Sequence, residues 1–293
     1  MKTASHETRR ARPERGTILV TGATGNVGRH LVENLSKDGV AVRALVRDPS
    51  TARLASGVEI VRGDLLIPET LDPSLRGVES VFLLWPSLDA GTAPAVLDRI
   101  ARHARRVVFL SAASVPDDLD VPPTTFHGDI ERLVARSGMV WTFLRPTGFA
   151  TNTLGWAQQI KDGVVRWPYG RAARSLIHEA DIADVAARVL TGDGHDSARY
   201  VLTGPEAITQ FEQVKIIGDT VGRTVRYEEL SPADARQQLL AAWGNPSFVD
   251  GALAYWASLE SQPEQVTRTV EEITGKPARS FRQWANDHAA DFR

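Results

Sequence analysis

The stretch that decides the fold is TILVTGATGNVG, residues 17–28, together with the segment that continues to residue 48. It opens on a short apolar run of the kind that a strand buried on both faces needs. A glycine-rich turn follows, and apolar residues then recur at four-residue spacing over residues 27–35, which predicts one face of a helix. Alternating valines predict a second strand over residues 40–46. The stretch therefore reads as strand, turn, helix and strand.

The turn holds three glycines, and each has a separate physical use. Gly22 lets the chain turn sharply, Gly25 removes a side chain where a diphosphate must touch backbone, and Gly28 lets the helix lie close to the sheet. The first amides of the helix and the positive end of its dipole attract phosphates. Because the triplet follows a strand and opens a helix, it predicts a dinucleotide site rather than a turn without a ligand. The expected contacts are Gly22, Thr24, Gly25, Asn26, Val27 and Gly28.

The end of the second strand selects between the two nicotinamide dinucleotides. An acidic residue there would bind the ribose 2′-hydroxyl of NAD, whereas an arginine accommodates the 2′-phosphate of NADP. Arg47 occupies that position, so NADP, as NADPH, is the expected cofactor. Arg43 is a weaker second choice, and Asp48 is placed to pair with Arg47. The alternative is that Arg47 is an ordinary surface arginine.

Composition excludes several kinds of site. The chain has 293 residues, of which 42% are hydrophobic, and this is enough for a large core. It has no cysteine, which excludes disulfides, zinc–thiolate sites and a thiol nucleophile, and we expect no metal. No apolar run approaches the roughly 20 residues of a membrane span, and no signal peptide is evident, so we expect a cytoplasmic protein away from the membrane.

Charge is uneven along the chain. The formal net charge is −2, but residues 1–15 hold five Lys/Arg and two Asp/Glu, which leaves 29 basic and 34 acidic residues in the remainder. The net negative charge of this remainder argues against nucleic acid as a partner. The polar, unpatterned segment 1–15 is predicted to be a disordered basic leader.

Further apolar segments predict the rest of a doubly wound parallel sheet in an α/β fold. Strands are expected at 58–61, 80–86, 107–110 and 140–144. Helical segments are expected at 49–56, 68–76, 92–104 and 125–137. In such a sheet, ligands lie at the carboxyl ends of the strands, where the strand order reverses.

Side chains at that edge are the other candidate cofactor contacts. Asp64 ends the third strand and either accepts from the adenine amino group or caps the next turn. The remaining contacts follow the third, fourth and sixth strands, and they are Leu65, Leu84, Trp85, Pro86, Pro146 and Phe149.

The sequence changes in character after Phe149. The nucleotide-binding core is predicted at 16–150, with 176–204 packing back on it through a helix and a seventh strand. Segments 151–175 and 205–293 are predicted to form a smaller, mostly helical substrate lobe.

Aromatic residues and helix caps mark that lobe. Capping-box patterns at Thr209-x-x-Glu212 and Ser280-x-x-Gln283 each predict a helix start. The aromatic side chains either line an apolar cleft or pack in a core. The expected substrate contacts are Trp85, Phe149, Asn152, Trp156 and Tyr169.

With these segments in place, the chain resembles the atypical short-chain dehydrogenase/reductases of the NmrA-like, NAD(P)-binding group over residues 17–292. The motifs that carry the resemblance include TGATGNVG (21–28), RALVRD (43–48), GDL (63–65), LRP (144–146) and HEADIA (178–183). The resemblance implies a Rossmann fold and bound NAD(P). It leaves the activity open, because the group includes reductases, quinone oxidoreductases and regulators that sense the cofactor.

The sequence departs from the wider dehydrogenase pattern at one place. These enzymes normally carry a Tyr-x-x-x-Lys pair on the helix after the fifth strand, where Tyr protonates the substrate and Lys lowers its pKa. The corresponding segment here runs from His127 to Glu131, so an anion replaces the lysine. The usual proton relay is therefore not expected.

Two functions compete on this sequence. In the first, NADPH gives a hydride to a carbonyl or quinone of an apolar, aromatic or polyketide-like molecule, and Ser111, Ser114, His127 or the substrate itself supplies the proton. The alternatives are that Ser111 bonds a neighbouring strand end and that His127 is exposed or caps a helix. In the second, the protein binds NADP(H) without turnover and reports its redox state to a partner. We favour the reductase, acting on a small molecule as a monomer or homodimer.

Overall fold

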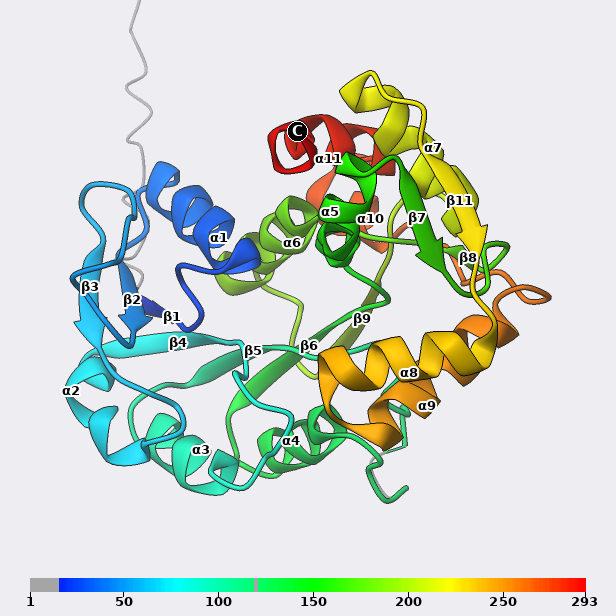
Figure 1. Ribbon diagram of the computed structural model, residues 1–293. Helices are drawn as coiled ribbons and strands as arrows, with labels where there is room; N and C mark the ends of the chain where they lie inside the picture. Colours follow the sequence, from blue (N-terminus) through cyan, green and yellow to red (C-terminus); the bar gives the residue numbers. More distant parts are fainter. Residues whose placement is uncertain (1–15, 119–120) are drawn as a thin grey trace, which may run out of the picture.

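A seven-stranded parallel sheet forms the centre of this computed structural model, which describes residues 16–118 and 121–293 (Figure 1). Across the sheet, the strands are β3 (Glu59–Arg62), β2 (Val42–Val46), β1 (Thr17–Val20), β4 (Val78–Leu83), β5 (Arg106–Leu110), β6 (Val140–Pro146) and β9 (Ala198–Leu202). The order reverses between β1 and β4, which pair directly. The predicted doubly wound α/β sheet is therefore confirmed, with β9 as its seventh strand.

Helices cover both faces of this sheet (Figure 1). The helices of one face are α1 (Asn26–Lys37), α6 (Glu179–Thr191) and α10 (Thr269–Thr274). The helices of the other face are α2 (Asp72–Leu75), α3 (Ala93–Ala101) and α4 (Phe126–Ala135), and the 3-10 turn η1 (Pro68–Thr70) precedes α2. Each face has its own apolar cluster, in which strand side chains such as Phe82 and Phe109 are fully buried. Continuous apolar strands require this burial on both faces.

Helix α1 takes the position that its spacing predicts. Val27, Leu31 and Leu35 are all buried against the sheet. On its other side α1 packs against α6, and Asn34 Nδ2 donates to Asp184 Oδ1 at 2.7 Å. The expected helical turn at residues 49–56 is a simple turn instead, held by the Asp48 carboxylate.

The remaining elements form a lobe beside the carboxyl edge of the sheet. Its helical elements are η2 (Ala150–Trp156), α5 (Ala157–Lys161), α7 (Gln210–Val221), α8 (Pro232–Trp243), α9 (Pro246–Ser258), α11 (Phe281–Asp287) and η3 (Ala289–Phe292). Two small sheets, which the sequence did not predict, join them. They pair β7 (Val164–Trp167) with β11 (Arg226–Glu229), and β8 (Ala173–Arg174) with β10 (Ile208–Thr209).

Both predicted capping boxes are present. Thr209 accepts from the Glu212 amide and Glu212 accepts from the Thr209 amide at the start of α7. Ser280 and Gln283 make the same reciprocal pair at the start of α11. These caps fix the helix starts of the lobe because they satisfy amides that have no partner within the helix.

A buried histidine–carboxylate network joins α6 to the C-terminal elements. The Glu179 carboxylate is fully buried, and its Oε1 lies 2.7 Å from His288 Nε2. His178 Nε2 lies 3.3 Å from Asp287 Oδ2. Burial raises the pKa of Glu179, but hydrogen bonds from His178, its own backbone and His288 outweigh it and lower that pKa to about 2.

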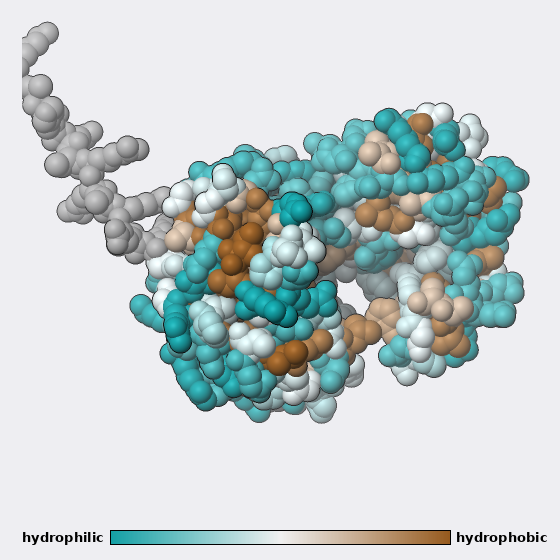
Figure 2. Space-filling model, turned by 60° about the vertical axis from the view of Figure 1, so that its left-hand side comes forward, coloured by the Kyte–Doolittle hydropathy of each residue, from teal (hydrophilic) through white to brown (hydrophobic). Residues whose placement is uncertain are grey.

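A notch separates the core and the lobe on one side of the molecule (Figure 2). In the described part of the chain, the structure contains no helix that is long and apolar enough to cross a membrane. The predicted leader, residues 1–15, lies outside the described residues.

Candidate active site

The glycine-rich turn between β1 and α1 forms a cradle of exposed backbone. Gly22 has φ +62°, a conformation that favours glycine. A Cβ added at Gly28 would lie 2.1 Å from the Gly22 carbonyl oxygen, so helix α1 could not pack there with a side chain. At Gly25 the same distance is 3.2 Å, and the residue faces solvent. Gly28 thus serves packing, whereas Gly25 offers bare backbone to a ligand.

The first turn of α1 is open to an anion. Gly25 is its N-cap and provides no side-chain cap, and the first turn carries no acidic residue. Thr24 and Asn26 are exposed beside it, while Val27 is buried and anchors the helix. The free amides and the positive end of the helix dipole therefore fit a phosphate group.

Thr21 fastens the end of β4 to this cradle. Its hydroxyl donates to the Leu84 carbonyl at 3.1 Å and accepts from the Leu84 amide at 2.7 Å. The Leu84 side chain lies over Gly22, since a Cβ added there would be 3.3 Å from it. Leu84 and the exposed Pro86 thus lie at the predicted edge. Trp85 turns away into the core, where its indole N–H donates to the Asp89 carbonyl.

Two arginines lie at the adjoining ends of β2 and β3. Arg47 is exposed just after β2, and Arg62, which pairs in register with Val46, is exposed at the end of β3. Asp48 does not pair with Arg47, because its Oδ1 accepts from the Ser50 amide and hydroxyl. Arg43 is not available either. It bonds Glu59 and two carbonyls at the opposite edge of the sheet, those of Ser74 and Arg76.

Asp64 caps a turn after β3. Its Oδ1 accepts from the Leu66 amide at 2.9 Å, and its own amide donates to Thr70 Oγ1. Leu65 is buried in the core. The sequence left open whether Asp64 contacts the adenine amino group or caps the next turn, and the structure contains the turn cap.

The segment after β5 carries an unpaired hydroxyl. Ser111 is 3% exposed, and its Oγ has no hydrogen-bond partner among the described residues. Its backbone is fixed, because the Ser111 amide donates to Leu144 and the Ala113 amide donates to Pro146. Ser114 is exposed at the end of the same segment. Burying a hydroxyl without a partner costs free energy, and such a group signals a missing ligand contact.

The segment that replaces the Tyr–Lys pair lies in α4. His127 packs against Phe126, with ring centroids 3.8 Å apart and the rings tilted, and it also lies near Phe109. Burial lowers the pKa of His127 to about 4, so the ring is neutral near neutral pH. A neutral ring is a weaker proton donor than a protonated one, and the role of His127 as a general acid stays a prediction.

Glu131 does not place an uncompensated charge in the site. Its two oxygens bind Arg145 through Nε at 2.9 Å and Nη2 at 2.6 Å, and Glu131 is fully buried. Arg145 also donates to Asp117 and to the Pro116 carbonyl. The pair therefore ties α4 and the segment after β5 to the end of β6.

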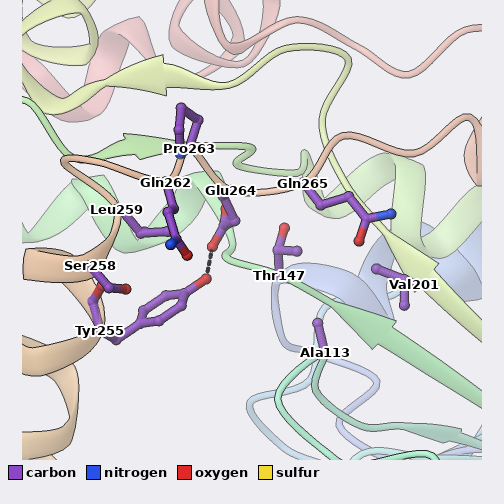
Figure 3. A pocket seen from close by; sticks show the side chains of 10 residues that line it. All are labelled: Ala113, Thr147, Val201, Tyr255, Ser258, Leu259, Gln262, Pro263, Glu264 and Gln265. Atoms are coloured by element: carbon purple, nitrogen blue, oxygen red, sulfur yellow. Dashed lines mark hydrogen bonds between the residues drawn. The ribbon is translucent and has the colours of Figure 1, made fainter.

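A pocket of about 340 Å³ opens between the sheet edge and the lobe (Figure 3). Ala113 and Thr147 line one side of it, and α9 with the segment that follows lines the other. Tyr255 donates to the buried Glu264, whose other oxygen accepts from the Ser175 amide at 2.7 Å and its hydroxyl at 3.0 Å. The pocket lies next to the segment that carries Ser111.

Comparisons with known proteins identify the family of this chain. Residues 22–193 match the model of a family described as NAD(P)H-binding. The chain belongs to this NAD(P)H-binding family. A "(4-alkanoyl-5-oxo-2,5-dihydrofuran-3-yl)methyl phosphate reductase" of Streptomyces griseus is 40% identical over 285 residues, covering 94% of this chain and 99% of the relative. An NAD(P)H azoreductase of Xenophilus azovorans is 35% identical over 284 residues, with 94% and 99% covered.

A solved structure of an NADPH-dependent enzyme shows the same architecture. The NADPH-dependent quinone oxidoreductase of Escherichia coli, in complex with NADPH, aligns with a TM-score of 0.77 and 25% identity over 92% of this chain and 99% of that one. The predicted family and cofactor are thus confirmed. The predicted class, an oxidoreductase, is supported by all three of these proteins.

The predicted substrate residues do not line the pocket. Trp85 and Trp156 are 6% and 4% exposed and pack in apolar clusters of the core and the lobe. Tyr169 packs against the cluster beneath α8 and α9, with φ 56°. Asn152 is exposed, and Phe149 is half-buried against the cluster that contains α1. For the tryptophans, core packing is therefore the correct alternative.

The residues that do line the pocket carried no local signal in the sequence. Thr147 and Ser175 bond one another across 3.2 Å, but they are 28 residues apart. Glu264 reaches the site only because segment 259–264 pairs with β8, through the Ala173 amide and carbonyl. Arg62 lies outside this pocket, and the sequence analysis did not name it, although its place directly after the predicted third strand could have marked it beside Arg47.

Proposed function

We propose that the protein is an NADPH-dependent reductase that transfers a hydride to a carbonyl, quinone or similarly conjugated acceptor of an apolar or aromatic small molecule. The observation that carries the proposal is one shared sheet edge. It joins an open phosphate cradle, the buried free hydroxyl of Ser111 and a substrate-sized pocket. We assign cofactor binding to the core at 16–150 with 176–204, and substrate binding to the lobe at 151–175 and 205–293.

The chain’s own residues fit the cofactor. The amides of the first turn of α1 would hold the diphosphate, with Gly25 and Asn26 in contact. Arg47 and Arg62 would hold the 2′-phosphate between them, because both are exposed and both lie at the end of neighbouring strands. When bound, NADPH supplies the hydride.

A strong side-chain acid is not needed for this chemistry. A quinone or a conjugated acceptor gives an anion that resonance stabilises, and water or the substrate can complete its protonation. Ser111 Oγ–H would donate a hydrogen bond to that anion, since it has no other partner among the described residues. His127, neutral and packed against Phe126, would shape the apolar wall rather than deliver a proton.

The relatives support the acceptor class. Their names specify reduction of a furanone phosphate, azo compounds and quinones. These acceptors share a polarised multiple bond in conjugation, which accepts a hydride and delocalises the charge. We therefore place quinones, azo dyes and enones ahead of simple aliphatic ketones.

Turnover with a substrate panel tests the proposal. The purified protein would be mixed with NADPH and, separately, with quinones, azo dyes, conjugated enones and aliphatic ketones, and loss of nicotinamide absorbance followed. We expect turnover of at least one conjugated class and a lower KM for NADPH than for NADH. Tight NADPH binding with no turnover of any class would contradict the reductase and favour a redox sensor.

Compartment and assembly are also proposals. We propose a cytoplasmic protein that works as a monomer or homodimer on a small molecule, without nucleic acid or membrane. Light scattering on a sizing column measures the assembly, and a larger oligomer would contradict it.

A further inference from the structure

Arg174 is a half-buried cation in the lobe that has no ion-pair or hydrogen-bond partner among the described residues. It ends β8, and its Nε is buried without a hydrogen-bond acceptor in the described ranges. No ion pair or hydrogen bond involves its guanidinium within residues 16–118 and 121–293. A buried guanidinium without an acceptor costs free energy, so its position needs an explanation.

Two other inward arginines show how this fold normally satisfies such groups. Arg145 binds Glu131, Asp117 and a carbonyl. Arg199 also has a buried Nε without an acceptor, but its guanidinium lies 4.9 Å from the Trp141 ring centroid as a cation–π contact. Arg174 has neither kind of partner in the described chain. It is therefore the inward arginine that remains free to bind something else.

The fold holds this guanidinium against the end of β6. A Cβ added at Gly148 would lie 2.2 Å from Arg174 Nη2 and 3.0 Å from its Cζ. The guanidinium thus rests on bare backbone, next in sequence to Thr147 of the pocket wall.

The acidic residue of the pocket wall does not pair with the Arg174 guanidinium. Glu264 is the acidic residue that lines the pocket, but both of its oxygens already accept hydrogen bonds, from Ser175 and Tyr255. The positive charge of Arg174 interacts electrostatically with the Tyr255 hydroxyl. Burial and Glu264 raise the pKa of Tyr255, and Arg174 opposes that rise. Arg174 is not one of the residues that line the pocket, but it lies against Gly148, which follows Thr147 of the pocket wall.

We propose that Arg174 binds an oxyanion carried by the substrate, a phosphate monoester or a carboxylate, and so selects anionic substrates. A guanidinium presents two parallel N–H groups to two oxygens, which suits either group. The inference rests on the proposed function, since it assigns the occupant to the pocket beside the cofactor. The alternative is that Arg174 binds an oxyanion of the cofactor, and the experiments below distinguish a substrate oxyanion from a cofactor oxyanion.

Direct binding tests the proposal without turnover. Protein loaded with NADP⁺ would be titrated with phenyl phosphate and with benzoate by calorimetry. We expect Arg174→Gln to weaken binding of at least one of them roughly 10-fold or more, the loss of a charged hydrogen-bond pair. Arg171→Gln removes the same charge from an exposed position three residues away and should leave both affinities unchanged. Equal affinity in Arg174→Gln and wild type would overturn the proposal.

Two further measurements fix the source of the anion. The NADPH dissociation constant should be equal in wild type and Arg174→Gln, and a 10-fold rise would move the oxyanion to the cofactor and contradict us. With a carboxylated azo dye and its neutral methyl ester, kcat/KM should fall only for the acid. An equal fall for both would indicate a structural role and overturn selection.

The design also separates this proposal from the reductase itself. A protein that binds phenyl phosphate through Arg174 but reduces nothing would retain the anion site and lose the proposed function. A protein that reduces neutral acceptors but binds neither phenyl phosphate nor benzoate would retain the proposed function and lack the anion site. Should Arg174→Gln unfold, Arg174→Lys keeps the charge without the fork and should still weaken binding.

Discussion

At the scale of the residue, Ser111 separates a functional role from a structural one. Its hydroxyl is buried and has no partner among the described residues, so the folded state gains nothing from it. We predict that Ser111→Ala changes the free energy of unfolding by less than about 1 kcal/mol, while kcat/KM falls roughly 10-fold. Chemical denaturation and steady-state kinetics measure the two effects. Ser175→Ala is the control, since it loses bonds to Glu264 and should destabilise instead.

Arg47 is the residue that tests cofactor choice. Arg47→Asp removes a phosphate partner and adds repulsion, so NADPH should bind at least roughly 10-fold more weakly, with NADH little changed. Fluorescence titration of both cofactors measures this. Arg136→Asp makes the same change at the exposed end of α4 and should alter neither affinity. An equal loss for NADPH and NADH in Arg47→Asp would refute the assignment.

His127 gives stability a pH dependence of known sign. Its pKa is about 4 in the folded protein and 6.5 ordinarily, so the unfolded chain binds the proton first as pH falls. Stability from this group is complete above about pH 6.5 and is lost toward about pH 4. We predict that His127→Leu lessens the loss over that window by about 2 kcal/mol. Urea unfolding at several pH values measures it, and identical pH profiles would contradict it.

At the scale of the element, the turn into α1 performs two separable tasks. Gly25→Val should fold, because an added Cβ meets one atom at 3.2 Å, but it should abolish NADPH binding by covering the phosphate cradle. Gly28→Val should lower the melting temperature strongly, because its Cβ would meet backbone at 2.1 Å. Calorimetry and cofactor titration distinguish them. Wild-type affinity in Gly25→Val would show that the turn is only structural.

Elements with a strong local pattern were predictable, and those without one were not. Helix α1, the buried strands and both capping boxes follow from spacing and cap chemistry over a few residues. The two-residue strands β8 and β10 are too short to show a period, and they exist because the lobe pairs them. The sequence located the cofactor cradle but not the pocket. Tyr255 and Glu264 reach the site only through tertiary folding.

At the scale of the whole molecule, the chain builds one sheet edge and then covers it. The lobe contributes a pocket wall to the edge that holds the cradle and Ser111. The Glu179 network, which contacts His288 and His178, fixes the C-terminal elements to α6. The proposed site thus combines segments more than 200 residues apart. That distance is why local sequence patterns could predict the cofactor and the fold but did not name the residues that line the pocket.

The central claim is that this molecule transfers a hydride from NADPH. The most direct test uses NADPH deuterated at the C4 position, one arm for each face, with a conjugated acceptor that turns over in the panel. A carbon acceptor such as an enone is chosen so that the transferred atom stays bonded. Mass spectrometry of the product should find deuterium from one arm alone. If the product carried no deuterium in either arm, this result would contradict hydride transfer at this site.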